Sequence, residues 1–262
     1  MAAIDMSTPA HAVNGPEVRR IGIADLRDAL AKGFADFMAA PTHVVFLSVI
    51  YPIVGLLLFR ATFAYDLIPL LFPLLAGFAL IGPFAAIGLY EISRVREQGQ
   101  PVSWRTAFGV LKSRSLVAIL ILGAALMALF FGWLAAAQGI YAAHFGPMPP
   151  KSLSVLMNQI MTTPQGTKVL VAGNLVGFVF AVIAFTISVV SFPLLIDRNV
   201  GAATAIVTSI RAVLVNPVTM AMWAILIAGA LVVGSLPLLV GLAIVMPVLG
   251  HATWHLYRKL VV

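Results

Sequence analysis

Long runs of uncharged, apolar residues are the feature that most restricts the fold of this chain. Residues 116–138 and 169–196 contain no Asp, Glu, Lys or Arg. A helix needs runs of about this length to cross roughly 30 Å of hydrocarbon at about 1.5 Å per residue. In the whole chain 61% of the residues are hydrophobic and 10% are charged, whereas soluble domains are about a quarter charged. The sequence therefore predicts an all-α membrane protein.

Hydropathy divides the chain into six predicted transmembrane helices. They cover Val44–Phe59, Leu67–Tyr90, Leu116–Gln138, Val169–Ile196, Val218–Gly234 and Leu236–Tyr257. Residues 218–257 are almost unbroken, but this run is about twice the length of one span, and the sequence GSLP at 234–237 predicts a turn within it. Residues 1–20 have no apolar core and predict a disordered cytoplasmic tail. Residues 21–262 then form a single transmembrane domain.

Basic residues set the predicted orientation. Of the 16 Lys and Arg residues, Arg60, Lys151 and Lys168 lie on one side of the predicted membrane and the other 13 on the opposite side. Because Lys and Arg are concentrated in cytoplasmic segments, both termini are predicted to be cytoplasmic. The net charge of +7 is then explained by anionic lipid headgroups beside the spans, and nucleic acid is not expected as a partner.

Three segments have the pattern of amphipathic helices in the membrane interface. In the first, apolar residues at helical spacing lie opposite charged ones: Ile23, Leu26, Leu30, Phe34, Phe37 and Met38 against Asp25, Arg27, Asp28, Lys32 and Asp36. Residues 205–217 repeat this plan at identical offsets, and Ser103–Lys112 form a third copy without the proline. A further amphipathic segment, 152–161, predicts a short helix on the outer surface.

The helices that return to the cytoplasm also repeat. Residues 83–94 and 247–258 both fit the pattern P-x6-[YW]-x3-R. We therefore expect three hairpin repeats in parallel orientation, each preceded by an interfacial amphipathic helix. Aromatic and basic side chains at the ends of spans typically lie among the headgroups. The predicted interfacial anchors are Tyr90, Arg94, Trp254 and Arg258.

Histidines are the main candidates for chemistry, since no Asp, Glu, Lys or Arg lies in the middle of a predicted span. His251 lies inside the last span and His255 one turn nearer its end. With His43 and Glu91 they share the cytoplasmic half, so one interpretation is a metal or haem site. The favoured alternative is that His251 bonds a neighbouring helix and His255 lies among the headgroups, because HATWH has Ala252 where a zinc protease motif has Glu.

Other chemical motifs are missing from the sequence. It contains no cysteine and no Walker A, G-x-S-x-G, HExxH or dinucleotide-binding motif. We therefore expect no cofactor and no enzymatic activity.

Three stretches carry a resemblance to a known family. They are GFALIGPFAAIGLYEISRVREQGQPVSW (77–104), SFPLLIDRNVGAATAI (191–206) and PVLGHATWHLYR (247–258). They resemble the bacterial membrane family catalogued as domain of unknown function 2189, over nearly all of the chain after about Arg19. The resemblance implies the bacterial inner membrane and no established activity.

Some members of that family carry a cytochrome c oxidase label. A haem-copper catalytic subunit needs several histidines deep in its spans, and one intramembrane histidine does not provide them. The label leaves open an accessory or assembly role beside a respiratory complex.

The leading functional prediction is a non-enzymatic accessory, assembly or scaffolding factor. It would act through a membrane-protein partner, a second copy of the chain or anionic lipids. The first alternative is a channel or transporter for a small neutral solute, indicated by the repeats and the helix-breaking prolines, with a polar cavity lined by Ser48, Asn174 or Ser191. The second is a haem or metal protein that uses His251 and His255.

Overall fold

The computed structural model describes residues 15–39, 49–64, 67–237 and 239–262. The α-helices are α1 (Ile23–Ala39), α3 (Ile50–Ala64), α4 (Leu71–Phe78), α5 (Gly82–Ala85), α6 (Ile87–Glu97), α7 (Leu116–Phe145), α8 (Leu153–Thr162), α9 (Pro164–Ser188), α10 (Ser191–Asp197), α11 (Ala202–Val215), α12 (Pro217–Ser235) and α13 (Leu242–Leu260). Three 3-10 helices accompany them: η1 (Ile68–Leu70), η2 (Ala79–Ile81) and η3 (Trp104–Lys112). Within these residues the strand-type pairing is limited to an isolated antiparallel bridge between Val18 and Val261, so the all-α prediction is confirmed.

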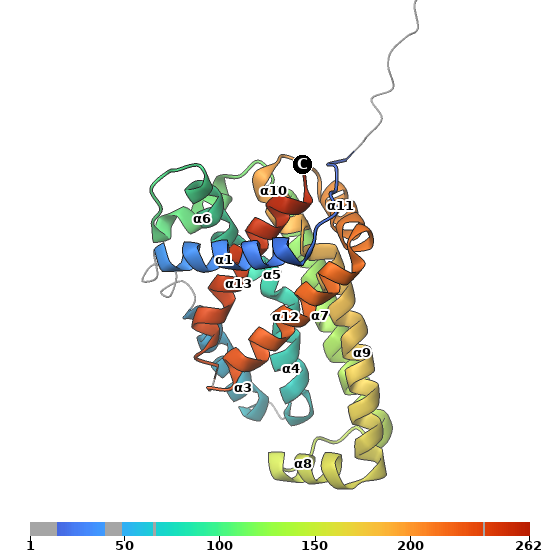
Figure 1. Cartoon of the computed structure of the whole chain (residues 1–262). Helices are drawn as coiled ribbons and strands as arrows, with labels where there is room; N and C mark the ends of the chain where they lie inside the picture. The colour runs from blue at the N-terminus through green and yellow to red at the C-terminus, as the bar shows by residue number, and fades with distance from the viewer. Residues whose placement is uncertain (1–14, 40–48, 65–66, 238) are drawn as a thin grey trace, which may run out of the picture.

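Helices occupy each of the six predicted transmembrane segments (Figure 1). Three described helical stretches are long and apolar enough to cross a membrane: Leu116–Phe145, Pro164–Asp197 and Pro217–Ser235. The second segment is divided into short helices around Pro83, and α13 is more polar because it carries two histidines and ends in Arg258 and Lys259. The structure thus confirms membrane-length helices in an all-α chain.

The order of elements follows one plan three times. One helix comes first, called here the short helix of its unit, and two apolar helical segments follow: α1 before α3 and α4–α6, η3 before α7 and α9–α10, and α11 before α12 and α13. In the first unit α1, with 17 residues, is no shorter than α3, with 15. The predicted outer helix is also present as α8, between α7 and α9. The Ser152 hydroxyl caps it by accepting a hydrogen bond from the Val155 amide at 3.3 Å.

Each short helix packs on the returning segment of the unit before it. η3 packs on α6, and α11 packs on α9 and α10. The short helix of the first unit, α1, lies across α13 of the last unit (Figure 1). The three units therefore close into a ring.

Small residues allow close approach at two of these junctions. A Cβ atom on Gly33 of α1 would lie 2.5 Å from the backbone nitrogen of Ala252 in α13, and one on Gly88 of α6 would lie 2.9 Å from the Cβ of Ala107 in η3. Gly88 and Ala252 both follow the proline of P-x6-[YW]-x3-R at the same spacing. The repeat seen in the sequence thus corresponds to a repeated contact in space.

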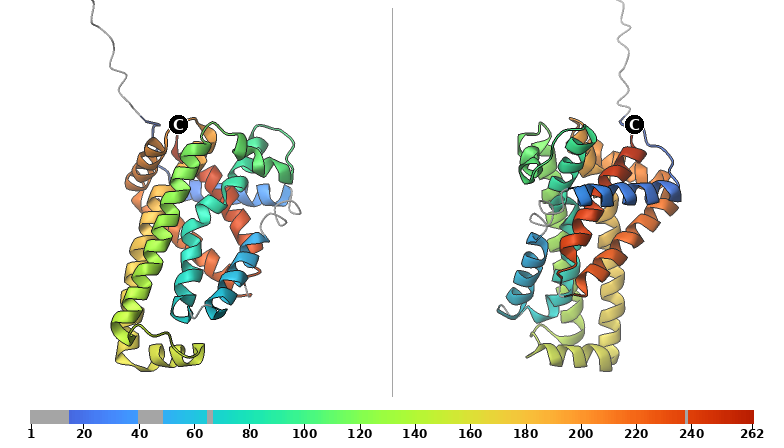
Figure 2. Two further views of the ribbon diagram at one scale, coloured as in Figure 1. Left: turned by 180° about the vertical axis from the view of Figure 1, so that it is seen from behind. Right: turned by 60° about the vertical axis from the view of Figure 1, so that its left-hand side comes forward.

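The short helices gather toward one end of the molecule. α1, α6, α11 and the C terminus lie near this end, and α8 lies at the other, where α7 and α9 run side by side (Figures 1 and 2). Lys151 and Lys168 flank α8, as the charge pattern predicted.

Two sequence predictions about the N-terminal region need correction. The predicted disordered tail does not reach residue 20, because the amide of Arg19 donates to the carbonyl of Leu260 at 2.8 Å and the Asn216 side chain bonds the Ile21 amide. The helix at 23–39 is confirmed, but one residue of its predicted polar face, Asp36, is buried, with 8% of its surface exposed. Phe34 of the predicted apolar face is 53% exposed, as expected of a side chain that faces lipid. Contact with α13, which offers polar partners, decides which side of α1 is buried.

Candidate functional site

A cluster of buried polar side chains joins α1, α6 and α13. We call it the Asp36 cluster; it consists of Asp36, Ser93, Arg96, His251 and His255. Asp36 comes from α1, Ser93 and Arg96 come from α6, and the two histidines lie one turn apart on α13. Asp36, Ser93 and His251 are buried. Buried polar groups are costly without hydrogen bonds, so their partners decide what the cluster does.

Asp36 is the central acceptor of the cluster. Its Oδ2 accepts a hydrogen bond from Ser93 Oγ at 2.6 Å and another from His255 Nε2 at 2.8 Å. Its Oδ1 lies 3.4 Å from Nε of Arg96, and Nη1 of Arg96 donates to the carbonyl of Ala35 at 2.9 Å. The single carboxylate therefore ties α1 to both α6 and α13.

Ser93 fixes the tautomer of His251. Ser93 Oγ lies 2.8 Å from His251 Nδ1 as well as bonding Asp36. Because an ionised carboxylate only accepts, the Ser93 hydroxyl donates to Asp36, and the Nδ1–H of His251 donates to Ser93. Neutral His251 then keeps a lone pair on Nε2, which is buried and has no hydrogen-bond partner within the described residues.

The order of these groups differs from that of a catalytic triad. In a Ser-His-Asp triad the histidine lies between the other two and accepts the serine proton. Here Ser93 lies between Asp36 and His251, and its proton is directed at the carboxylate. The geometry suits a tie between helices.

The environment of Asp36 lowers its pKa below the ordinary value of 3.8. Burial raises the pKa, but hydrogen bonds from His255 and Ser93, together with the electrostatic interaction between the carboxylate and the two imidazoles, lower it by more. The ionised form is therefore stabilised in the folded protein.

We expect the Asp36 cluster to weaken in acid. Since the folded-state pKa of Asp36 is lower than the unfolded one, its ionised form stabilises the fold above about pH 3.8, and this stabilisation is lost as the pH falls through the folded pKa. Thermal unfolding of the detergent-purified protein between about pH 7 and pH 3 should show a falling midpoint, with a smaller fall in D36N. Equal falls in the two proteins would show that another group is responsible.

A second polar layer surrounds the end of α13. Tyr257 Oη donates to Asp197 Oδ2 of α10 at 2.6 Å, and Trp254 Nε1 donates to Glu97 Oε2 of α6 at 3.1 Å. Arg258 pairs with both of these carboxylates, at 3.3 Å and 3.1 Å. The end of α13 is therefore bonded to α6 and α10 as well as to α1.

This layer changes the role of the predicted anchors. Tyr90 and Trp254 were expected among the headgroups, but both side chains are buried in the protein. Arg94 and Arg258 are partly exposed and are paired with carboxylates. The two rings lie inward because neighbouring helices cover this end of α6 and α13.

The candidate metal ligands do not all come together. His251 and His255 share the Asp36 cluster, whereas both oxygens of Glu91 bond the Arg94 guanidinium, at 2.7 Å and 2.8 Å. His43 lies outside the described residues. Within the part of the chain that the structure describes, no group of three His, Asp or Glu side chains is arranged to hold a metal ion.

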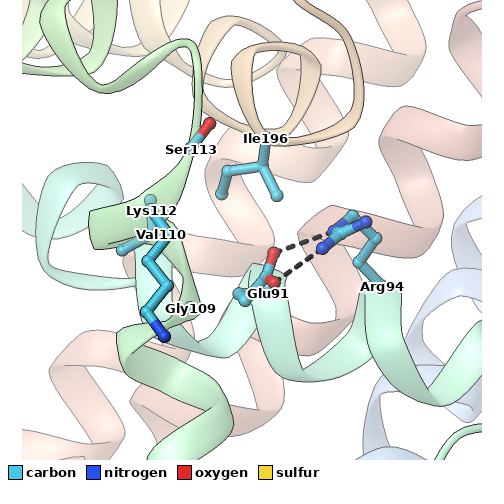
Figure 3. Close-up of a pocket in the computed structure, with 7 residues that line it drawn as sticks. All are labelled: Glu91, Arg94, Gly109, Val110, Lys112, Ser113 and Ile196. Atoms are coloured by element: carbon cyan, nitrogen blue, oxygen red, sulfur yellow. Dashed lines mark hydrogen bonds and ion pairs between the residues drawn. The ribbon is translucent and has the colours of Figure 1, made fainter.

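Glu91 instead lines a pocket of about 170 Å³ between α6, η3 and α10 (Figure 3). The lining residues are Glu91, Arg94, Gly109, Val110, Lys112, Ser113 and Ile196. A Cβ atom on Gly109 would lie 2.9 Å from Glu91 Oε1, so the glycine makes room for the carboxylate. Because Arg94 neutralises Glu91, Lys112 supplies the remaining charge at this pocket.

Sequence reasoning did not find the partners of the histidines. Asp36 and His255 are 219 residues apart, and Ser93 and His251 are 158 apart. No spacing pattern links positions so distant. The one available signal was that His251 replaces an aliphatic residue, Ile87, at the same place in the repeat.

Comparison with known proteins finds a family that resembles part of the chain. Residues 71–197 match a family model described as predicted integral membrane protein (DUF2189). The match includes all of 77–104 and the start of 191–206, whereas 247–258 lies outside it. This confirms the resemblance over residues 71–197 and the membrane assignment, and it supplies no activity. No curated protein and no solved structure matches the chain.

Proposed function

We propose that this chain, whose residues 71–197 belong to a family of integral membrane proteins, is a six-span accessory, assembly or scaffolding factor without enzymatic activity. Its partner is another membrane protein or a second copy of the chain. The observation that carries the proposal is the Asp36 cluster. Its carboxylate, hydroxyl and guanidinium groups and the imidazole of His255 bond to one another or to backbone across α1, α6 and α13. They hold the ring of helices together and leave its apolar outer faces for lipid and protein contacts.

The positions of the charges support a location in the bacterial inner membrane with both termini in the cytoplasm. The basic ends of α6, α13 and the short helices share one end of the molecule, and α8 with Lys151 and Lys168 lies at the other (Figure 1). This distribution agrees with the concentration of basic residues on the cytoplasmic side of membrane proteins.

The transport alternative receives less support. Asn174 is exposed on α9 and its amide donates to the carbonyl of Leu170 at 2.8 Å. Ser191 is buried and its hydroxyl donates to the carbonyl of Ile187 at 2.6 Å. Each therefore bonds its own helical segment, as polar side chains in spans commonly do. Ser48 lies outside the described residues.

The haem or metal alternative has one observation in its favour, the unpartnered Nε2 of buried His251. An absorbance spectrum and metal analysis of the purified protein test it directly.

Co-purification tests the scaffold proposal. We expect the full chain, extracted in mild detergent, to carry a reproducible membrane-protein partner or to form a stable homo-oligomer. The variant D36A should lose this association because it opens the ring, whereas D28N, which removes only the exposed ion pairs of Asp28 with Lys32 and with Lys259 of α13, should keep it. A monomer without a reproducible partner in all three preparations would contradict the proposal.

A further inference from the structure

The 3-10 helix η3 turns most of its apolar side chains outward. In η3 only Ala107 is buried, at its contact with Gly88 of α6. Trp104, Phe108 and Leu111 are 41%, 50% and 62% exposed. A 3-10 helix has about three residues per turn, so Phe108 and Leu111 lie in one exposed row. Half or more of the surface of each residue in this apolar row is left uncovered by the described protein.

The start of η3 is fixed despite its exposure. Ser103 and Thr106 form a capping box, in which the Ser103 amide donates to Thr106 Oγ1 at 3.0 Å. The helix is also pinned to α6 by the Gly88–Ala107 contact, where an added Cβ would meet Ala107 at 2.9 Å. The outward face of η3 is therefore held in a fixed position relative to α6.

Three cations accompany the apolar row. Arg105, Lys112 and Arg114 are exposed, and none of them forms an ion pair within the described residues. The segment 98–115 contains no Asp or Glu. The Arg105 guanidinium lies over the Trp104 ring, 5.4 Å from its centroid. Positive charge on η3 therefore remains available to an external anion.

α1 provides the contrast. Its exposed Lys32 pairs with Asp28 at 3.0 Å, and Lys259 of α13 pairs with Asp25 and Asp28 at 3.2 Å and 2.8 Å. Much of the charge on α1 is thus neutralised within the protein. The sequence predicts α1 and η3 to be equivalent copies. In the structure α1 takes part in several ion pairs, whereas η3 takes part in none within the described residues.

We propose that the η3 surface, formed by Trp104, Arg105, Phe108, Leu111, Lys112 and Arg114, docks into the headgroup layer of a membrane leaflet rich in anionic phospholipid. The exposed rings and Leu111 would enter the apolar boundary, and the three unpaired cations would contact lipid phosphates. Charge complementarity and the pairing of aromatic with basic side chains select lipid over a protein partner. This inference goes beyond the scaffold proposal and does not depend on it.

Trp104 supplies a probe for this contact. The chain has four tryptophans, and Trp133, Trp223 and Trp254 are buried. The full chain is reconstituted in nanodiscs that contain equal amounts of phosphatidylglycerol and phosphatidylcholine. In each sample only one of the two lipids carries bromine near the top of its acyl chains, where it quenches nearby tryptophan. The difference between the wild type and W104F isolates the Trp104 signal.

We expect brominated phosphatidylglycerol to quench Trp104 roughly twofold more than brominated phosphatidylcholine. The triple variant R105Q/K112Q/R114Q should lose this preference and keep the quenching itself. Its unfolding temperature should match that of the wild type, because all three side chains are exposed. If neither brominated lipid quenches Trp104, then solvent, a second copy or another protein faces this side chain, and the proposal is overturned. Equal quenching by the two lipids in the wild type would also overturn it.

Discussion

Replacing Asp36 with alanine is expected to destabilise the folded protein by about 3–5 kcal/mol. The substitution removes the carboxylate that accepts from Ser93 and His255 and pairs with Arg96. These groups stay buried or half-buried at the α1–α13 junction, and removing one partner leaves them without compensation for their lost hydration. Unfolding in mild detergent, followed by tryptophan fluorescence, measures the change.

D28N provides the matched control on the same helix. Asp28 pairs with Lys32 and Lys259 at the surface, so its loss is expected to cost within about 1 kcal/mol. D36N should fall between the two, since the amide keeps one acceptor oxygen and loses the charge. If D36A and D28N unfold alike, the Asp36 cluster does not hold the ring together.

A side chain at Gly33 is expected to push α1 away from α13. The Cβ of G33A would lie 2.5 Å from the backbone nitrogen and 2.6 Å from the Cα of Ala252. Backbone atoms cannot rotate aside, so the helices must separate. We expect G33A to cost roughly 1–3 kcal/mol, although alanine favours a helix by about 1 kcal/mol over glycine. G33L should cost more.

Helical glycines in open space are the controls for G33A. Gly139 of α7 and Gly173 of α9 have no atom within 4 Å of an added Cβ. G139A and G173A should therefore leave stability unchanged or raise it by up to about 1 kcal/mol. The double variant G33A/D36A should cost less than the sum of its parts, because both changes open one junction. Full additivity would mean that the two residues act independently.

The position of α1 and α13 in the chain explains why polar contacts are concentrated at the junction between them. η3 follows α6 directly, and α11 follows α10 directly, so those junctions form between neighbouring segments. α1 and α13 lie at opposite ends of the sequence, and a contact between distant segments has a larger loop-closure entropy to overcome. The Asp36 cluster, the ion pairs of Lys259 and the hydrogen bonds of Asn216 all lie at or beside this junction.

Sequence patterns of packing were only partly reliable. A GxxxG pair such as Gly173 and Gly177 of α9 is typical of close helix packing, but of these two only Gly177 has a close contact, where an added Cβ would lie 2.9 Å from the Trp133 ring. η3 had the predicted position, with a 3-10 turn in place of an α-helical one. Small residues and amphipathic spacing show that a contact is allowed, and the neighbouring element decides whether it forms.

The sequence by itself determined the helices of this protein. Apolar runs, prolines and amphipathic spacing are local properties, and they located the six apolar segments, the three short helices and α8, although α6 and α7 each end seven residues beyond the predicted span. They also defined the repeat unit and the distribution of basic residues between the two sides of the predicted membrane.

Only the tertiary structure decided how these parts combine. It brought Asp36 to His255 across 219 residues, gave His251 a partner in Ser93, and turned Trp254 inward and Trp104 outward. Hydrophobic periodicity shows which side of a helix is apolar, but in a membrane protein both lipid and neighbouring helices accept an apolar side. Which of the two a residue meets depends on contacts between distant segments, and no local pattern in the sequence encodes them.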